Sequence, residues 1–451
     1  MTKITAQNVH ETLGKYMLAD GFDLVFDLEK SHGSWFYDLR TGQKYLDFFT
    51  FFATAPVGFN HPRFTTPEMI QKLGKLSINN ITNSDLYTIE MAEFVETFFR
   101  IAVPPYTKHS FFVAGGTLGV ENALKAAMDW KVRKNLAKGY RREIGSKVIH
   151  FEEAFHGRSG YTMSLTNTAD PNKYKYFAKF DWPRIVNPKI TFPLTEGNLE
   201  QVERLERRAI AQIKTAFKTN PDEICSIIIE PIQGEGGDNH FRAEFLKELR
   251  NLANENDAML IVDEVQAGVG LTGKMWVHQH YGFEPDMIAF GKKTQVCGFL
   301  CGKRIEEVED NVFAVGSRLN STWGGNLIDM YRFKVLLEII QEEKLVENAA
   351  KMGDVLLAGL QKLAGEFPEL VHNVRGKGLM CAIDLPTSEL RDALRRELYA
   401  NGLVALGSGT KSIRFRPALN MSKNEIETGV DIFRRSLRNL TSHQKIAQPV
   451  A

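Results

Sequence analysis

The feature that most constrains the fold of this chain is a series of five short apolar runs between residues 109 and 290. Each run has four or five residues, and enough residues lie between successive runs for a helix. Such runs are typical of strands buried on both faces of a parallel sheet, because helices cover both sides of these sheets. We therefore predict an α/β fold with a mostly parallel sheet, whose strands include 109–113, 147–151, 226–229, 259–262 and 287–290.

The pattern changes after this series. At 451 residues the chain is too long for one small core, so two domains are expected. Long amphipathic stretches and the strand patterns GKGLMCAIDL and SIRFRPAL follow the series. We predict an N-terminal segment at 1–62, a large α/β domain at 63–332 and a smaller α+β domain at 333–451.

The composition is that of an ordinary globular protein. Apolar residues make up 43% and charged residues 25%. The net charge of +1 offers no large excess to steer nucleic acid or an anionic membrane. The N-terminus lacks the apolar segment of a secretory signal, and no apolar stretch is long enough to span a bilayer. The four cysteines have no metal-site spacing, so we predict reduced thiols, no metal and a cytoplasmic protein.

A carboxylate and an amine follow two of the predicted strands. Asp263 follows the fourth run, and Lys292 and Lys293 follow the fifth. Parallel strands end at the same sheet edge, where such folds bind ligands, so these groups are expected to share a site. A carboxylate for an electron-poor ring nitrogen and an amine for an aldehyde suit pyridoxal phosphate. The pattern leaves open which lysine faces the site, and a turn-capping acid beside a solvated lysine pair is the alternative interpretation.

Other residues near the predicted strand ends are of types that bind such a cofactor or its substrates. Gly116 and Thr117 open an amphipathic helix, whose free N–H groups bind anions, although a plain turn explains them equally well. Gln266 suits a bond to the ring oxygen, Phe155 suits stacking on a flat cofactor, and Arg158 suits a carboxylate.

Four more polar positions lie in glycine-rich or strand-like segments: Glu235, Asn320, Thr322 and Arg414. Arg414 is a second candidate for a carboxylate. For each of the four, an ordinary polar loop or edge strand is the alternative.

The segment Gly268–Gly273 matches the dinucleotide-binding pattern GxGxxG. In that motif the glycines follow the strand at once and open a helix. Here five residues intervene after the strand, and the following segment is short and aromatic. A nucleotide-dependent oxidoreductase is therefore a distant alternative.

Taken together and in this order, the motifs resemble those of the subgroup-III, fold-type-I aminotransferases that depend on pyridoxal 5'-phosphate. The resemblance covers residues 20–435 and rests on at least six motifs. It implies a homodimer with shared active sites, and an N-terminal segment that packs with the smaller domain. The runs FHGRSGYTMSLTNT, EPIQGEGGD, FGKKTQVCG and SRLNSTWGGN are similar to those of members that act on the ε-amino group of lysine.

The resemblance implies how the cofactor is held. Lys292 would form a Schiff base with it, Asp263 would pair with its ring nitrogen, and Gln266 would contact its ring oxygen. Phe155 would stack on the ring. The phosphate would be held by Gly116 and Thr117, with Thr322 from the neighbouring subunit.

The resemblance also implies how the substrates bind. Arg158 would bind a carboxylate of lysine or 2-oxoglutarate, and Arg414 would bind the second carboxylate of the oxo acid. Glu235 would pair with Arg414 when lysine is bound and swing away for 2-oxoglutarate. The catalytic residues are then Lys292, Asp263 and Glu235, and the substrate-binding residues are Phe52, Arg158, Glu235, Gln266, Asn320 and Arg414.

The implied reaction transfers the ε-amino group of L-lysine to 2-oxoglutarate. Its products are 2-aminoadipate 6-semialdehyde and L-glutamate, and its two half-reactions make it ping-pong. An ω-aminotransferase for ornithine or 4-aminobutyrate is the near alternative, because lysine and ornithine differ by only one methylene.

Overall fold

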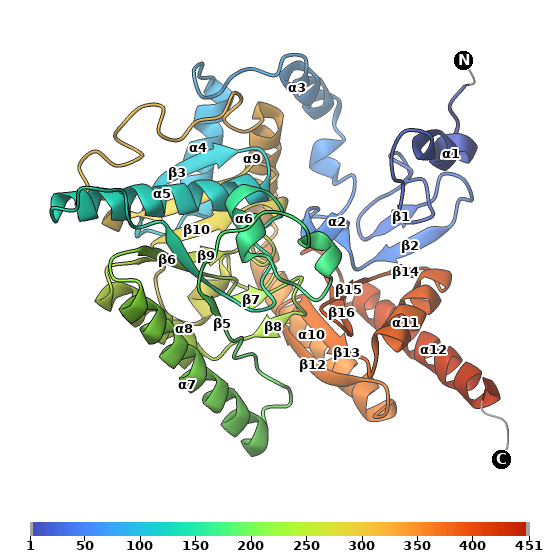
Figure 1. The fold of residues 1–451 in the computed structure, drawn as a ribbon. Helices are drawn as coiled ribbons and strands as arrows, with labels where there is room; N and C mark the ends of the chain where they lie inside the picture. Colours follow the sequence, from blue (N-terminus) through green and yellow to red (C-terminus); the bar gives the residue numbers. More distant parts are fainter. Residues whose placement is uncertain (1–2, 448–451) are drawn as a thin grey trace.

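A computed structural model describes residues 3–447, with side chains to residue 442, so residues 448–451 of the predicted smaller domain lie outside the described residues. Its centre is a seven-stranded sheet in the order β3-β11-β10-β9-β6-β4-β5 (Figure 1). All five predicted runs lie in its strands, and only β11 runs antiparallel to its neighbours, so the prediction of a mostly parallel sheet is confirmed. The strands are β3 (Thr107–Val113), β4 (Lys147–Phe151), β5 (Arg184–Ile185), β6 (Ile224–Ile229), β9 (Met259–Asp263), β10 (Met287–Phe290) and β11 (Cys297–Gly302).

Helices cover both faces of this sheet, as the apolar strands require. Met259 and Ile261 of β9 pack in the cluster beneath α5 (Gly116–Ala137), whereas Leu260 and Val262 point to the opposite cluster. The opposite face is covered by α4 (Ile89–Ile101) and α8 (Ala243–Glu255), with α7 (Glu196–Thr219) beside β5 (Figure 1). The alternation of side chains along β9 therefore joins both layers to one sheet.

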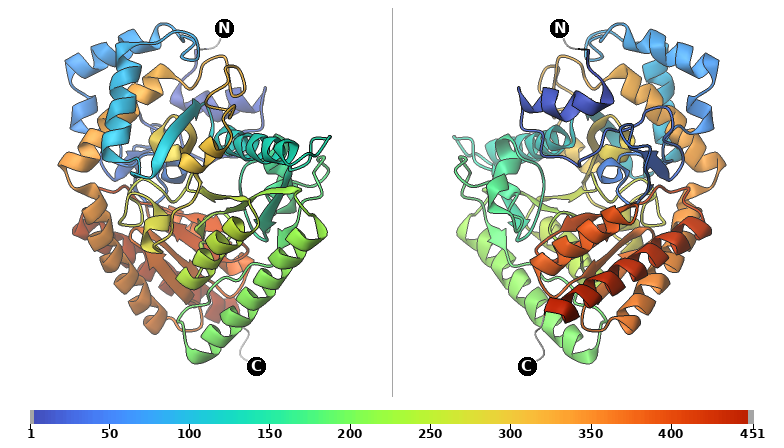
Figure 2. Two further views of the ribbon diagram at one scale, coloured as in Figure 1. Left: turned by 90° about the vertical axis from the view of Figure 1, so that its left-hand side faces the viewer. Right: turned by 90° about the vertical axis from the view of Figure 1, so that its right-hand side faces the viewer.

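The C-terminal part forms a second sheet, with the antiparallel order β12-β13-β16-β15. Two views from opposite sides, each turned by 90° from Figure 1, show its helices, in orange and red, packed together on the outer side of this part (Figure 2). Its elements are α10 (Leu345–Glu366), β12 (His372–Lys377), β13 (Met380–Asp384), α11 (Ser388–Ala400), β15 (Leu406–Ser408), β16 (Ser412–Phe415) and α12 (Lys423–Ala447).

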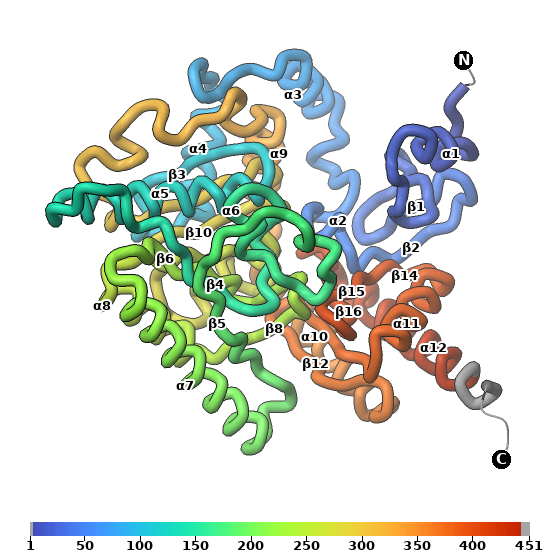
Figure 3. The backbone as a smooth tube through the Cα atoms, viewed as in Figure 1, coloured from blue at the N-terminus to red at the C-terminus, as the bar shows by residue number. Residues whose placement is uncertain are grey.

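The two ends of the chain meet in a small three-stranded sheet. β14 (Leu403–Val404) pairs with β2 (Lys44–Asp47), which pairs with β1 (Trp35–Tyr37). In the tube view the blue N-terminal segment accordingly lies beside the red C-terminal part (Figure 3). α9 (Leu327–Glu342) runs through the predicted boundary at 332–333, and the division into domains by residue number stays a prediction.

The remaining elements connect these layers. They are α1 (Val9–Gly14), α2 (Thr50–Ala53), α3 (Pro67–Ser77), α6 (Gly160–Leu165), β7 (Ile232–Gln233) and β8 (Asn239–His240). Among residues 3–447, no helix is long and apolar enough to cross a membrane.

Candidate active site

The turn after β10 separates the two candidate lysines. Lys293 is 1% exposed, and its amine donates to the backbone carbonyl of Gln266 at 2.5 Å. Lys292 is half-buried, and within the described part of the chain its amine has no hydrogen-bond partner. Its φ of 55° lies in the left-handed region, which non-glycine residues seldom adopt and which clusters at functional sites. The backbone thus turns one lysine into the protein and leaves the other amine free.

The surroundings of Lys292 make its amine a better nucleophile. Burial lowers its pKa from 10.5 to about 8, and the nearby charge of Arg414 acts in the same direction. Asp263 opposes this shift by favouring the charged amine. A larger neutral fraction near neutral pH follows, as a lysine that attacks aldehydes requires.

Asp263 is fixed in its orientation at the end of β9. It is 5% exposed, its Oδ2 lies 2.9 Å from His156 Nδ1, and its Oδ1 accepts the Val265 N–H at 3.0 Å. His156 Nε2 is buried and has no partner among the described residues. Beside this pair, Glu230 accepts the N–H of Phe155 at 2.9 Å, which fixes the backbone that carries the half-buried Phe155 ring.

Gln266 links the loop after β9 to the smaller sheet. Its Oε1 accepts from Arg416 Nη2 at 2.8 Å and from Arg414 Nη1 at 3.3 Å. The amide nitrogen of Gln266 therefore remains free to donate a hydrogen bond. Arg416 is 1% exposed and also binds the buried Asp238, so it anchors the position of Gln266.

The N-terminus of α5 is built to receive an anion. Its N-cap is Gly115, with φ 101°, and no side chain caps the first N–H groups. Gly116 and Thr117 are half-buried. A Cβ on Gly116 would lie 2.9 Å from the Val265 side chain, and one on Gly119 would lie 2.7 Å from the Gly298 carbonyl. The helix end therefore lies against the sheet edge that carries Lys292, with its N–H groups free.

Glu235 bridges two cations that lie far apart in the sequence. Arg414 Nη2 donates to its Oε2 at 2.7 Å, and Lys173 Nζ donates to its Oε1. Burial tends to raise the pKa of Glu235, but the two cations outweigh it, so that the pKa lies below its ordinary value. Arg414 is 3% exposed, and burial lowers its pKa while Glu235 opposes that shift. The structure thus joins the predicted pair and adds Lys173.

A left-handed turn holds Phe52 over the other side of this arginine. Residues Thr50–Ala53 all have positive φ, between 43° and 66°. The Phe52 ring centroid lies 6.0 Å from the Arg414 guanidinium. Asp47, which is fully buried, accepts the N–H groups of Phe49 and Thr50 at 2.7 and 2.9 Å, and Thr50 Oγ1 donates to the Arg416 carbonyl at 2.6 Å. Each such residue costs about 1–2 kcal/mol, so these bonds maintain a strained backbone.

Three predicted residues lie apart from this group within one chain. Arg158 is exposed, and its side-chain bond goes to the Lys173 carbonyl at 3.4 Å. Asn320 and Thr322 lie in an exposed loop, where Asn320 Oδ1 accepts the Ser321 N–H at 2.7 Å. Neither Asn320 nor Thr322 contacts Gly116 or Thr117 through a hydrogen bond within the described chain, and their assignments stay predictions.

The GxGxxG segment does not form a nucleotide-binding turn. Gly268, which lies in a turn and not directly after a strand, donates its N–H to the Glu264 carbonyl at 2.9 Å, and a Cβ there would lie 2.8 Å from Trp276. Gly270 and Gly273 are joined by a tight-turn bond of 2.9 Å. These glycines permit close packing and open no helix, so the basis of the oxidoreductase alternative is wrong.

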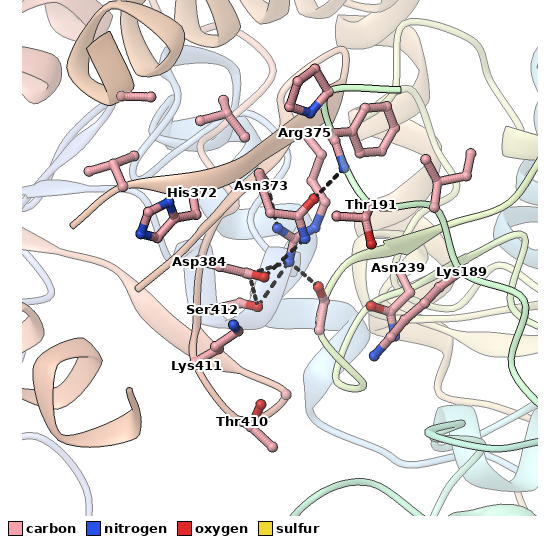
Figure 4. Close-up of a pocket in the computed structure, with 18 of the residues that line it drawn as sticks. Lys189, Thr191, Asn239, His372, Asn373, Arg375, Asp384, Thr410, Lys411 and Ser412 are labelled. Atoms are coloured by element: carbon pink, nitrogen blue, oxygen red, sulfur yellow. Dashed lines mark hydrogen bonds and ion pairs between the residues drawn. The ribbon is translucent and has the colours of Figure 1, made fainter. Parts of the chain in front are cut away.

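A cavity of about 770 Å³ lies behind the loop that carries Glu235. Its lining includes Gly236 and Gly237, and Figure 4 shows Arg375 at its centre, bonded to Asp384 and Ser412. Arg375 Nε also donates to the Asp238 carbonyl at 2.9 Å. These contacts hold the backbone that follows Glu235. Arg375 could not be predicted from the sequence, because its acceptors include backbone carbonyls of the distant loop at Gly237 and Asp238.

Comparison with known proteins places this geometry in context. Residues 17–437 match the family described as Aminotransferase class-III. The L-lysine-epsilon aminotransferase of Mycobacterium tuberculosis (strain H37Rv) is 50% identical over 438 residues, covering 97% of each chain. A solved structure of lysine aminotransferase from M. tuberculosis in the internal aldimine form is 50% identical, with a TM-score of 0.94 over 97% of this chain and 100% of that one. The 4-aminobutyrate aminotransferase of Emericella nidulans is 31% identical over 95% of this chain and 88% of its own.

Proposed function

Because the chain belongs to the class-III aminotransferases, we propose that it transfers the ε-amino group of L-lysine to 2-oxoglutarate with pyridoxal 5'-phosphate as cofactor. The products would be 2-aminoadipate 6-semialdehyde and L-glutamate. The family resemblance read from the motifs is confirmed, and the 50% identity to lysine-specific relatives, against 31% to a 4-aminobutyrate enzyme, supports lysine over the other ω-amines.

One observation carries the proposal. A free lysine amine, with its pKa lowered to about 8, lies at the edge of a parallel sheet beside a fixed carboxylate and a buried arginine. These are the groups that an aldehyde cofactor and a carboxylate substrate need together.

The residues present fit the cofactor. The uncapped N-terminus of α5, with Gly116 and Thr117, would hold the phosphate. Asp263, fixed by His156, would pair with the ring nitrogen. The free amide nitrogen of Gln266 would reach the ring oxygen, and Phe155 would cover a ring face. When bound, the cofactor supplies an aldehyde that takes up the amino group and a ring that withdraws electrons.

The chain's own residues would then handle the proton and the charge. The amine of Lys292 would anchor the cofactor, and once released it would take the proton from the ε-carbon of lysine as a general base. Its lowered pKa keeps a usable neutral fraction for that task. His156 would keep the Asp263 carboxylate aimed at the ring nitrogen throughout.

Two arginines would bind the substrates, and one of them, Arg414, would distinguish them. Arg158 would take a carboxylate that lysine and 2-oxoglutarate share. While lysine is bound, Glu235 would keep Arg414 neutralised, as it does at 2.7 Å here. A 2-oxo acid with a second carboxylate would replace Glu235 on Arg414. Phe52 would cover the arginine from the other side.

The proposal includes a cytoplasmic homodimer. Within one chain the loop with Asn320 and Thr322 is exposed and makes no bond to the α5 terminus. Thr322 of the partner subunit would complete the phosphate site, with Asn320 of the partner subunit nearby. Sedimentation of the holoenzyme tests this, since a monomer would contradict it.

A substrate panel tests the function. Lysine, ornithine and 4-aminobutyrate are each offered with 2-oxoglutarate, and glutamate formation gives kcat/KM for each. We expect lysine to be preferred. A preference for either of the other amines would favour the alternative ω-aminotransferase, and no glutamate from any of them would remove the proposal.

A further inference from the structure

Glu235 has a second cation that the predicted switch does not use. Its Oε2 binds Arg414, while Lys173 binds its Oε1. The two cations differ in setting: Arg414 is 3% exposed in β16, whereas the Lys173 side chain is 24% exposed in a short turn, Pro171–Lys173. Glu235 therefore lies between an inner and an outer cation.

The charges explain why a second cation matters. When a dicarboxylic 2-oxo acid binds Arg414, the carboxylate of Glu235 must leave it. A largely buried carboxylate that loses its only cation is strongly destabilised. Lys173 already holds the other oxygen, so Glu235 stays paired. Arg414 and Lys173 then pair with two carboxylates, that of Glu235 and the second carboxylate of the acid. Without Lys173, Arg414 would be the only cation for both.

The side chain of Lys173 can follow such a movement from a fixed turn. Asp170 caps it by accepting the Asn172 N–H at 3.0 Å, and Arg158 donates to the Lys173 carbonyl at 3.4 Å. The backbone is thus held, while the four-carbon side chain reaches Glu235 from the more exposed side. The same backbone carbonyl links the turn to Arg158, the arginine assigned to the shared carboxylate.

We propose that Lys173 is a positioning residue that retains Glu235 after it leaves Arg414, and that it thereby favours dicarboxylic over monocarboxylic amino acceptors. This rests on the proposed function, in which Arg414 takes the second carboxylate. It assigns Lys173 no contact with the reacting atoms.

Glutarate, a dicarboxylate that cannot accept an amino group, tests this in the holoenzyme through the absorbance of the bound cofactor. K173M should raise the Kd of glutarate about 10- to 150-fold, the effect of losing one hydrogen bond to a charged group, while the lysine concentration that half-saturates the loss of the yellow absorbance changes much less. K173R, which keeps the cation, should stay within about threefold of the wild type. In an E235Q background, K173M should have almost no further effect, because the two residues act as one unit.

Equal glutarate affinities in K173M and the wild type would overturn the proposal. Equal losses for glutarate and lysine would also overturn it, because they indicate a merely structural role. So would an undiminished effect of K173M in the E235Q background. If the wild type instead binds glutarate as expected but fails to form glutamate from lysine, the proposed function fails and the role of Lys173 stands on the glutarate titrations alone.

Discussion

The lowered pKa of Lys292 gives the most quantitative prediction. A lysine with a pKa of 10.5 is about 0.03% neutral at pH 7, whereas one at about 8 is about 9% neutral. The neutral amine is the nucleophile, so about 300 times more of the lysine is in the reactive form at pH 7. Removing the cofactor and remixing the apoprotein with pyridoxal phosphate from pH 6 to 10 measures this. The rate at which the yellow absorbance forms should rise with pH, with a midpoint near 8.

The cause of the shift has its own test. Burial is the largest cause, and the charge of Arg414 is the next that lowers the pKa. R414M should therefore move the midpoint to higher pH, while R414K, which keeps the charge, should leave it near 8. A wild-type midpoint near 10 would refute the reasoning, and a midpoint in R414M at or below the wild-type value would refute the part assigned to Arg414.

Three further predictions follow from particular contacts. K293M should keep the yellow absorbance that K292M loses, but should unfold at a lower temperature, because the Gln266 carbonyl loses its donor at a cost of about 1–3 kcal/mol; loss of absorbance in K293M would reverse the assignment of the two lysines. E235Q should bind glutarate about 10- to 150-fold more tightly in the same titration, because the dicarboxylate no longer displaces a charged partner of Arg414. Weaker binding would contradict the exchange of Glu235 for a substrate carboxylate on Arg414. Burial raises the pKa of Asp47 from 3.8 to about 7, so between these pH values the folded protein keeps a proton that the unfolded chain loses. The free energy of unfolding should therefore fall as the pH rises from 4 to 7, by at most about 4 kcal/mol. Urea denaturation should show this slope reduced in D47N, and parallel slopes would contradict it.

Some of the site was visible in the sequence because it depends on local order. Asp263 ends one buried strand and Lys292 follows another, and parallel strands deliver their ends to one edge. The glycine turn before α5 is also local, as is the apolar face of that helix: Val120, Ala123, Leu124, Ala127 and Trp130 are all at most 1% exposed. Longer-range partners could not be predicted in this way. His156 reaches Asp263 across 107 residues, and neither residue type specifies the other.

The sequence by itself determined the parallel sheet, the edge on which the chemistry lies and, through its motifs, the family, because strand periodicity and chain order are properties of neighbouring residues. The strand pattern left both lysines open and the motif resemblance implied Lys292, but only the tertiary structure shows the physical reason, since a φ of 55° at Lys292 and the packing of Lys293 against Gln266 separate two adjacent identical side chains. It alone also revealed Lys173, 62 residues away, on the oxygen of Glu235 that Arg414 does not bind. Such pairs form where separate layers of the fold meet, and the energy of a buried charge depends on what packs around it.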